Sequence, residues 1–173
     1  GADVVELGGG TGYLTRKLAR TARSVRAYDS SGHMVRVARR LCARTGVGNC
    51  TFAVADHRSI PIENAVADIV VGAWTILSLV VATWENDWQK ELDRCVAEAR
   101  RLLRSGGAVM VVETANLCGE LPDGQIWHPK RRDFLAYLED RHGFRKTCFR
   151  REWRYQSVRQ AARRRAGQLG IDI

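Results

Sequence analysis

A short apolar run that leads into four glycines within five residues constrains this chain more than any other segment. Residues 4–7 read Val-Val-Glu-Leu, and residues 8–12 read Gly-Gly-Gly-Thr-Gly. Glycines are required where a buried strand turns sharply into a helix and where a ligand approaches the backbone more closely than a Cβ atom permits. The segment therefore predicts a strand, a cofactor-binding loop and the first turn of a helix.

The spacing of these glycines narrows the type of cofactor. A dinucleotide-binding loop follows the pattern G-x-G-x-x-G, and its third glycine would fall at position 13, which is Tyr13. The chain instead has G-x-G-x-G, which ends at Gly12 and is preceded by Glu6. The pattern disfavours a nicotinamide-dependent oxidoreductase.

Strand-like and helix-like segments alternate along most of the chain, as in a parallel sheet that is covered on both faces. Strands are predicted at 4–7, 25–28, 51–55, 67–73 and 108–112, with an extended segment at 144–155. Helices are predicted at 11–21, 84–103, 129–141 and 158–169. A further helix is predicted to follow a cap at Ser30 or Ser31 and to end at Cys42. Residues 75–86 are expected to form a loop that helps to choose the substrate.

The glycine segment resembles the first motif, E-x-G-x-G-x-G, of the class I, Rossmann-like methyltransferases that depend on S-adenosylmethionine. Four further landmarks follow in the family's order. They are Asp29 after the second strand, Asp56 after the third, the apolar fourth strand at 67–74, and the helix, glycine turn and fifth strand at 101–113. This ordered set is far more specific than the glycine loop alone.

The resemblance implies an α/β fold, a three-layer Rossmann-like sandwich with a mostly parallel central sheet and helices on both faces. It implies a single methyltransferase domain over residues 1–173, in which 1–113 form the cofactor-binding core and 114–173 form the substrate-side and C-terminal part. Members of the family usually have helices before the first strand and a last antiparallel edge strand, whereas this sequence starts at the first strand and ends before or at the start of the last one. The chain is therefore either a minimal member or a fragment of a longer protein, and we expect the fragment.

The resemblance also implies how S-adenosylmethionine is held. The glycine loop approaches the methionine and ribose, Glu6 organises that loop, and Asp29 accepts hydrogen bonds from the ribose hydroxyls. Other residues border the adenine or lie where methionine and substrate meet, at the end of the fourth strand. The predicted cofactor-binding residues are Glu6, Gly8, Gly9, Gly10, Thr11, Gly12, Asp29, Ser30, Met34, Asp56, His57, Ala73 and Trp74.

No catalytic residue is identified by the sequence. Methyl transfer of this kind is an in-line displacement, so the protein mainly positions two reactants and, for weak nucleophiles, removes a proton. His57 is a candidate general base, although a loop histidine beside adenine is more often a packing residue. His128 is a second candidate, as a residue lining a substrate pocket. Trp74 is suited equally to stacking on a substrate ring and to capping the core.

Composition places limits on metals, membranes and compartment. The five cysteines, Cys42, Cys50, Cys95, Cys118 and Cys148, include no C-x-x-C pair and suggest neither a disulfide framework nor zinc, and no His, Asp and Glu cluster suggests another metal. No apolar run approaches the ~20 residues of a membrane span. The sequence has no signal-peptide pattern, so we expect a cytoplasmic protein without membrane association.

The formal charge of +9 raises nucleic acid as a partner. Nine Lys or Arg residues lie between Phe144 and Gly170, against one acid, Glu152. Such a band is suited to binding phosphates. Basic residues are also common on a solvated helix face and strand edge, and we favour this second interpretation.

Three functions remain open from the sequence. The favoured one is methyl transfer to an oxygen, nitrogen or carbon atom of a small molecule. The second is methylation of RNA or protein by a chain that docks through its basic C-terminal segment, and the third is a non-catalytic scaffold, against which the intact glycine loop argues. Residues 72–75 lack the Pro-Pro motif of enzymes that methylate amino groups of bases. The acceptor and the oligomeric state do not follow from the residues.

Overall fold

The structure, a computed structural model, describes residues 1–114, 129–149 and 156–157. Its central sheet has five parallel strands in the order β3-β2-β1-β4-β5. The strands are β1 (Asp3–Leu7), β2 (Ser24–Asp29), β3 (Cys50–Val54), β4 (Ala67–Ala73) and β5 (Leu103–Val112). The strand order reverses between β1 and β4, and ligands bind at the carboxyl ends of the strands beside such a reversal.

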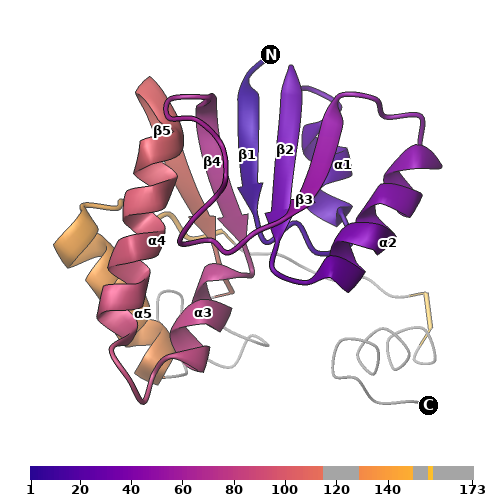
Figure 1. Cartoon of the computed structure of the whole chain (residues 1–173). Helices are drawn as coiled ribbons and strands as arrows, with labels where there is room; N and C mark the ends of the chain where they lie inside the picture. Colours follow the sequence, from indigo (N-terminus) through magenta and orange to yellow (C-terminus); the bar gives the residue numbers. More distant parts are fainter. Residues whose placement is uncertain (115–128, 150–155, 158–173) are drawn as a thin grey trace.

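Helices cover both faces of this sheet, with α1 behind it and α4 in front of it in Figure 1. The hydrophobic clusters place α1 (Tyr13–Leu18) and α2 (Gly32–Ala43) on one face, and α3 (Ile76–Ala82), α4 (Trp88–Leu102) and α5 (Pro129–His142) on the other. Side chains alternate between the faces along β1, so Val4 packs with α1 while Val5 and Leu7 join the cluster of α4. The predicted Rossmann-like fold class is confirmed.

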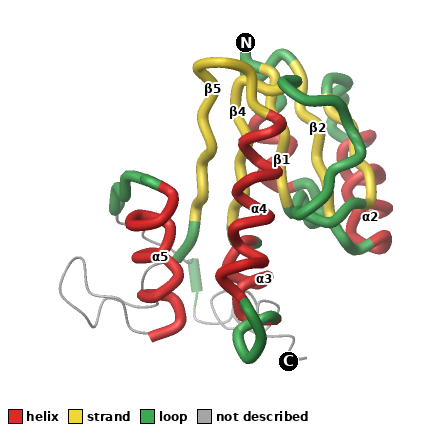
Figure 2. Tube along the Cα trace, turned by 60° about the vertical axis from the view of Figure 1, so that its left-hand side comes forward, coloured by secondary structure: helices red, strands yellow, loops and turns green. Residues whose placement is uncertain are grey.

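The largest part of the core lies between the sheet and α4. Val70 of β4, Leu92 and Leu102 of α4, and Phe134 of α5 are all fully buried there. Burying one side chain of this size contributes about 1.5–3 kcal/mol relative to leaving it exposed. Helix α3 lies at the end of α4 that is nearest the carboxyl ends of the strands (Figures 1 and 2). The core therefore fixes α3 next to the predicted site.

Two predicted elements on this side of the sheet differ from the structure. The helix expected at 84–103 begins at Trp88, because the Asp87 side chain caps it by accepting the Lys90 N–H at 3.3 Å. Trp84 nevertheless stacks on Trp88, with 4.7 Å between ring centroids and 7° between planes. Part of the expected loop at 75–86 is helix α3, whose buried Ile76 and Val80 anchor it to the core.

The boundaries of other elements also differ from those predicted. Helix α1 covers residues 13–18 instead of 11–21, and the cap of α2 is Ser31, whose Oγ accepts the Met34 N–H at 3.3 Å. Strand β5 starts at Leu103, and the expected glycine turn is a register shift within it. Residues 144–149 contain no strand. The predicted helix at 158–169 and most of the basic C-terminal band lie outside the described residues.

No helix in the described ranges is both long enough and apolar enough to cross a membrane.

Candidate cofactor site

The glycine loop after β1 is tied to the end of β2. The N–H groups of Gly8 and Gly9 both donate to the Tyr28 carbonyl oxygen, at 2.7 and 2.9 Å, and Gly12 N–H donates to Gly9 O at 2.8 Å. Gly8, Gly10 and Gly12 have φ angles of 71, 51 and 74°. These angles lie in the left-handed region that favours glycine, so the loop shape depends on these residues.

Gly8 and Gly10 are needed for different reasons. A Cβ atom on Gly8 would lie 2.1 Å from the Thr75 Oγ1, so this position is closed by the protein itself. A Cβ atom on Gly10 would have no described atom within 4 Å, so this position borders open space. A glycine that no neighbouring atom requires, yet that faces open space at the carboxyl edge of the sheet, fits a backbone that a ligand approaches closely.

Asp29, at the end of β2, stands directly beside Gly10. Its Oδ2 accepts the Gly10 N–H and its Oδ1 accepts the Ser31 N–H, both at 2.8 Å. A carboxylate has about four acceptor positions, so two bonds to backbone amides leave room for two more donors. Asp29 therefore connects the glycine loop to the start of α2 and keeps acceptor capacity for a ribose diol.

Glu6 lies under the loop and is a buried acid, with 2% of its surface exposed. The Thr15 hydroxyl, from α1, donates to Glu6 Oε2 at 2.5 Å. Burial raises the pKa of Glu6 to about 7, against a smaller lowering by the Thr15 hydrogen bond. Thr15 was not identified from the sequence, although an acid inside an apolar strand signals that a buried partner must exist.

We expect Glu6 to make stability depend on pH. Its ordinary pKa of 4.5 and its folded pKa of about 7 mean that the folded chain binds the proton more tightly. The contribution of Glu6 to the free energy of unfolding is therefore largest below pH 4.5. It decreases by about 3 kcal/mol as the pH rises through 7. Glu6→Gln keeps an acceptor for Thr15 and removes the titration, so it should unfold at higher urea than wild type at pH 8, with a much smaller difference at pH 5.

Glu63→Gln provides the control, because Glu63 is an exposed residue of a surface loop. Urea unfolding of this variant should follow wild type at both pH values. An equal difference between Glu6→Gln and wild type at pH 5 and pH 8 would contradict the linkage.

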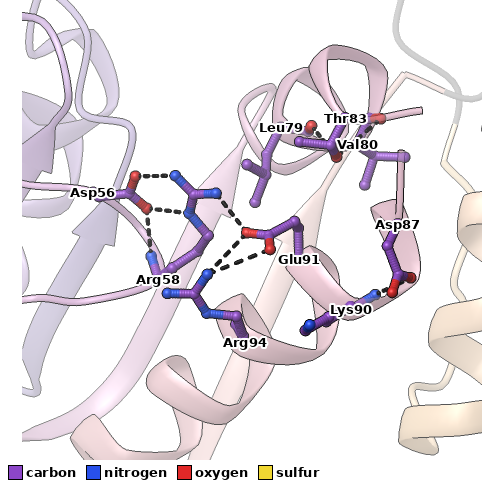
Figure 3. A network of polar contacts seen from close by, with 9 residues as sticks. All are labelled: Asp56, Arg58, Leu79, Val80, Thr83, Asp87, Lys90, Glu91 and Arg94. Atoms are coloured by element: carbon purple, nitrogen blue, oxygen red, sulfur yellow. Dashed lines mark hydrogen bonds and ion pairs between the residues drawn. The ribbon is translucent and has the colours of Figure 1, made fainter. Parts of the chain in front are cut away.

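The loop after β3 is held by a network of ions, shown in Figure 3. Arg58 donates from Nε to Asp56 Oδ1 at 2.8 Å and from Nη2 to Oδ2 at 2.5 Å. Its Nη1 reaches Glu91 Oε2 of α4 at 2.5 Å, and Arg94 pairs with the same glutamate. The hydrogen bonds from Arg58 are the main cause that lowers the pKa of Asp56 to about 2. The network anchors the loop to α4, a role that the sequence did not reveal for Arg58.

His57 lies within this anchored loop and is half-buried. Burial lowers its pKa, although the charges of Asp56 and Asp29 oppose that effect. A lowered pKa favours the neutral imidazole, which is the form that can accept a proton.

The end of β4 presents Trp74 in an unusual backbone conformation. Its φ is 54°, and its side chain is 49% exposed. The left-handed region costs a non-glycine residue about 1–2 kcal/mol. Two bonds hold it there, from its N–H to Val112 O at 2.8 Å and from Nε1 to Thr114 Oγ1 at 3.0 Å. Maintained strain at a sheet's ligand-binding edge is typical of functional residues.

Glu113, the next residue after β5, orders the neighbouring helix. Its Oε1 accepts the N–H of Leu77, in the first turn of α3, at 3.1 Å. Burial raises the pKa of Glu113, and the bonds to the backbone of this turn oppose the increase. The sequence marked Glu113 as a strand end but gave no sign of this contact, which depends on how α3 packs.

The remaining predicted residues are distributed around the same edge. Thr11 and Ser30 are exposed, Met34 is 38% exposed at the first turn of α2, and Ala73 is half-buried at the end of β4. The second candidate for a catalytic role, His128, lies outside the described residues. Within the described ranges, no group of three or more His, Cys, Asp or Glu side chains is arranged to hold a metal ion.

Comparisons with known proteins address the family directly. A family model described as a methyltransferase domain matches residues 4–107. The chain is 31% identical over 140 residues to the ubiquinone/menaquinone biosynthesis C-methyltransferase UbiE of Ralstonia pickettii, covering 79% of this chain and 49% of that protein. It is 34% identical over 110 residues to the malonyl-[acyl-carrier protein] O-methyltransferase of Hahella chejuensis, covering 62% of this chain and 35% of that protein.

A solved structure shares the fold. The crystal structure of a SAM dependent methyltransferase from Aquifex aeolicus superposes with a TM-score of 0.62 at 18% identity, covering 80% of this chain and 70% of that one. The chain spans about half or less of the two curated relatives. From the match over residues 4–107, together with the glycine loop and the sheet order, the chain belongs to the class I S-adenosylmethionine-dependent methyltransferases.

Proposed function

We propose that this chain holds S-adenosylmethionine at the carboxyl edge of its sheet and supports methyl transfer to an oxygen, nitrogen or carbon atom of a small molecule. The observation that carries the proposal is the open position at Gly10 next to the Asp29 carboxylate. A backbone that admits a ligand and an acid that can accept two further hydrogen bonds are what the ribose and methionine parts of this cofactor require.

The residues divide the work of binding between them. Glu6 and Thr15 support the loop from below, and Asp29 binds the ribose. The loop that contains Asp56 and His57, anchored by Arg58, borders the adenine. When bound, S-adenosylmethionine supplies an activated methyl group on a positively charged sulfur.

The acceptor side is formed by the end of β4. Trp74 presents an exposed aromatic face there, which suits an acceptor with an apolar or aromatic ring. Burial favours the neutral form of His57, but a side chain that borders the adenine is better suited to packing there than to removing a proton from the acceptor. One relative is named for ubiquinone/menaquinone biosynthesis and the other for malonyl-[acyl-carrier protein], and both names support small acceptors, although of different chemistry.

Calorimetric titration with S-adenosylmethionine and, separately, with NAD tests the cofactor. We expect binding of S-adenosylmethionine alone. Asp29→Asn should weaken it about tenfold, because an amide cannot replace both acceptor oxygens and loses the charge, a cost of about 1.4 kcal/mol. Asp140→Asn, an exposed acid on α5, is the matched control and should bind as wild type. NAD binding, or an Asp29→Asn variant with unchanged affinity, would refute the assignment.

The acceptor class is tested by incubating the chain with methyl-labelled S-adenosylmethionine and a fractionated cell extract. Label in the small-molecule fraction is expected, and it should disappear with Gly10→Ala. Label in the RNA or protein fraction would refute a small acceptor and favour the macromolecular alternative. Cofactor binding without transfer to any fraction would favour a binding scaffold.

A further inference from the structure

Two cysteines that are eight residues apart in sequence meet between α2 and β3. Cys42 lies in the last turn of α2, and Cys50 is the first residue of β3. Their Sγ atoms are 2.6 Å apart. This separation is about 0.5 Å longer than the 2.03–2.05 Å of a disulfide bond, so the two side chains already point at each other.

The surroundings of the pair keep the two sulfur atoms together. Cys42 is 4% exposed, packs in the cluster that contains Val35 and Phe52, and lies 3.6 Å from the Val47 carbonyl oxygen. Cys50 is half-buried and packs against the same cluster. The other cysteines of the described ranges are placed differently, since Cys95 is buried in α4 and Cys148 is exposed.

We propose that Cys42 and Cys50 form a site of intramolecular disulfide formation that joins α2 to β3. The oxidant is a small-molecule disulfide such as oxidised glutathione. The thiolate of Cys50, the more accessible of the two, attacks one glutathione sulfur and releases one glutathione thiol. Cys42 then attacks the mixed disulfide at Cys50 and releases the second. The protein loses two protons and two electrons, which appear in two reduced glutathione molecules.

The bond forms slowly at neutral pH and serves as a structural link. Burial, together with the hydrogen bond to Cys42, raises the pKa of Cys50 to about 12, so little thiolate exists near pH 7. The pair lies at the start of β3, at the end of the sheet opposite the carboxyl edge that carries the glycine loop. The disulfide therefore stabilises the contact between α2 and β3 without touching a predicted cofactor-binding residue.

Peptide mapping tests this directly on the wild-type chain. After incubation with oxidised glutathione at pH 8.5 and blocking of free thiols, trypsin releases residues 41–44 and 45–58, each with one of the two cysteines. We expect these two peptides to be linked, and the apparent Tm to rise by about 5–10 °C relative to the reduced protein. The link should disappear in Cys50→Ser and persist in Cys148→Ser, which removes the exposed thiol.

Three results would overturn the proposal. They are both peptides carrying the blocking group, both carrying glutathione separately, or a linked peptide with no rise in Tm. The wild-type mapping decides the matter even if Cys50→Ser does not fold. The outcome is independent of whether the chain binds S-adenosylmethionine.

Discussion

Gly10→Ala is expected to weaken the binding of S-adenosylmethionine at least 100-fold while the chain stays folded. The new Cβ would meet no described atom within 4 Å, so the protein accommodates it. At a φ of 51° the alanine costs about 1–2 kcal/mol of stability. The methyl group instead occupies the space from which the cofactor approaches the backbone. A 100-fold loss corresponds to about 2.7 kcal/mol of binding free energy.

Gly46→Ala is the matched control for this variant. Gly46 has a φ of 66°, and a Cβ atom there would also have nothing within 4 Å, but the residue lies between α2 and β3, away from the glycine loop. Urea unfolding should give similar losses for the two variants, whereas calorimetry should show wild-type affinity for Gly46→Ala alone. Gly10→Ala binding within threefold of wild type would show that the open space is not the cofactor site.

Gly8→Ala, by contrast, is expected to reduce the stability of the fold. Its Cβ would lie 2.1 Å from Oγ1 and 2.5 Å from Cβ of Thr75, and its φ is 71°. Thr75 directly precedes α3, which is anchored in the core by Ile76, so neither side can move freely. Overpacking and the left-handed backbone together are expected to cost about 2–5 kcal/mol in the free energy of unfolding. Urea denaturation followed by circular dichroism measures this loss.

A second substitution separates the two causes. Thr75→Gly removes the atoms in conflict, and it should be tolerated because the Thr75 side chain makes no capping hydrogen bond and glycine is accepted at helix N-caps. Gly8→Ala combined with Thr75→Gly should recover the overpacking part and leave about 1–2 kcal/mol for the backbone conformation. If the double variant is as unstable as the sum of the single ones, the two residues do not conflict as described.

These variants distinguish two roles within one loop that look alike in sequence. Both positions are glycines with positive φ, and the family motif requires both. Gly8 serves the packing of β1 against the start of α3, and Gly10 borders the open side of the loop. A binding assay alone would not separate them, because an unfolded Gly8→Ala chain would also fail to bind.

Much of the fold was predictable because it depends on short-range patterns. Apolar runs gave the strands to within a residue or two, except β5, which begins five residues earlier than expected. Helix α5 was predicted to within one residue, and its Phe134 and Leu138 are buried. The errors lie where local signals compete. Asp87 is a better N-cap for α4 than a residue before Trp84. The apolar run at 76–82 is compatible both with a loop over the core and with the helix α3 that forms.

For the site, the sequence determined the glycine loop, the acids that close β2 and β3, and hence the family, because these residues occur at set distances along the chain. Only the tertiary structure decided which distant groups meet them. Thr75 closes the space at Gly8, Arg58 joins Asp56 to α4, and Cys42 meets Cys50. The physical reason is that a motif records the needs of the local backbone, whereas contacts between elements depend on how helices pack on the sheet, which no short-range pattern specifies.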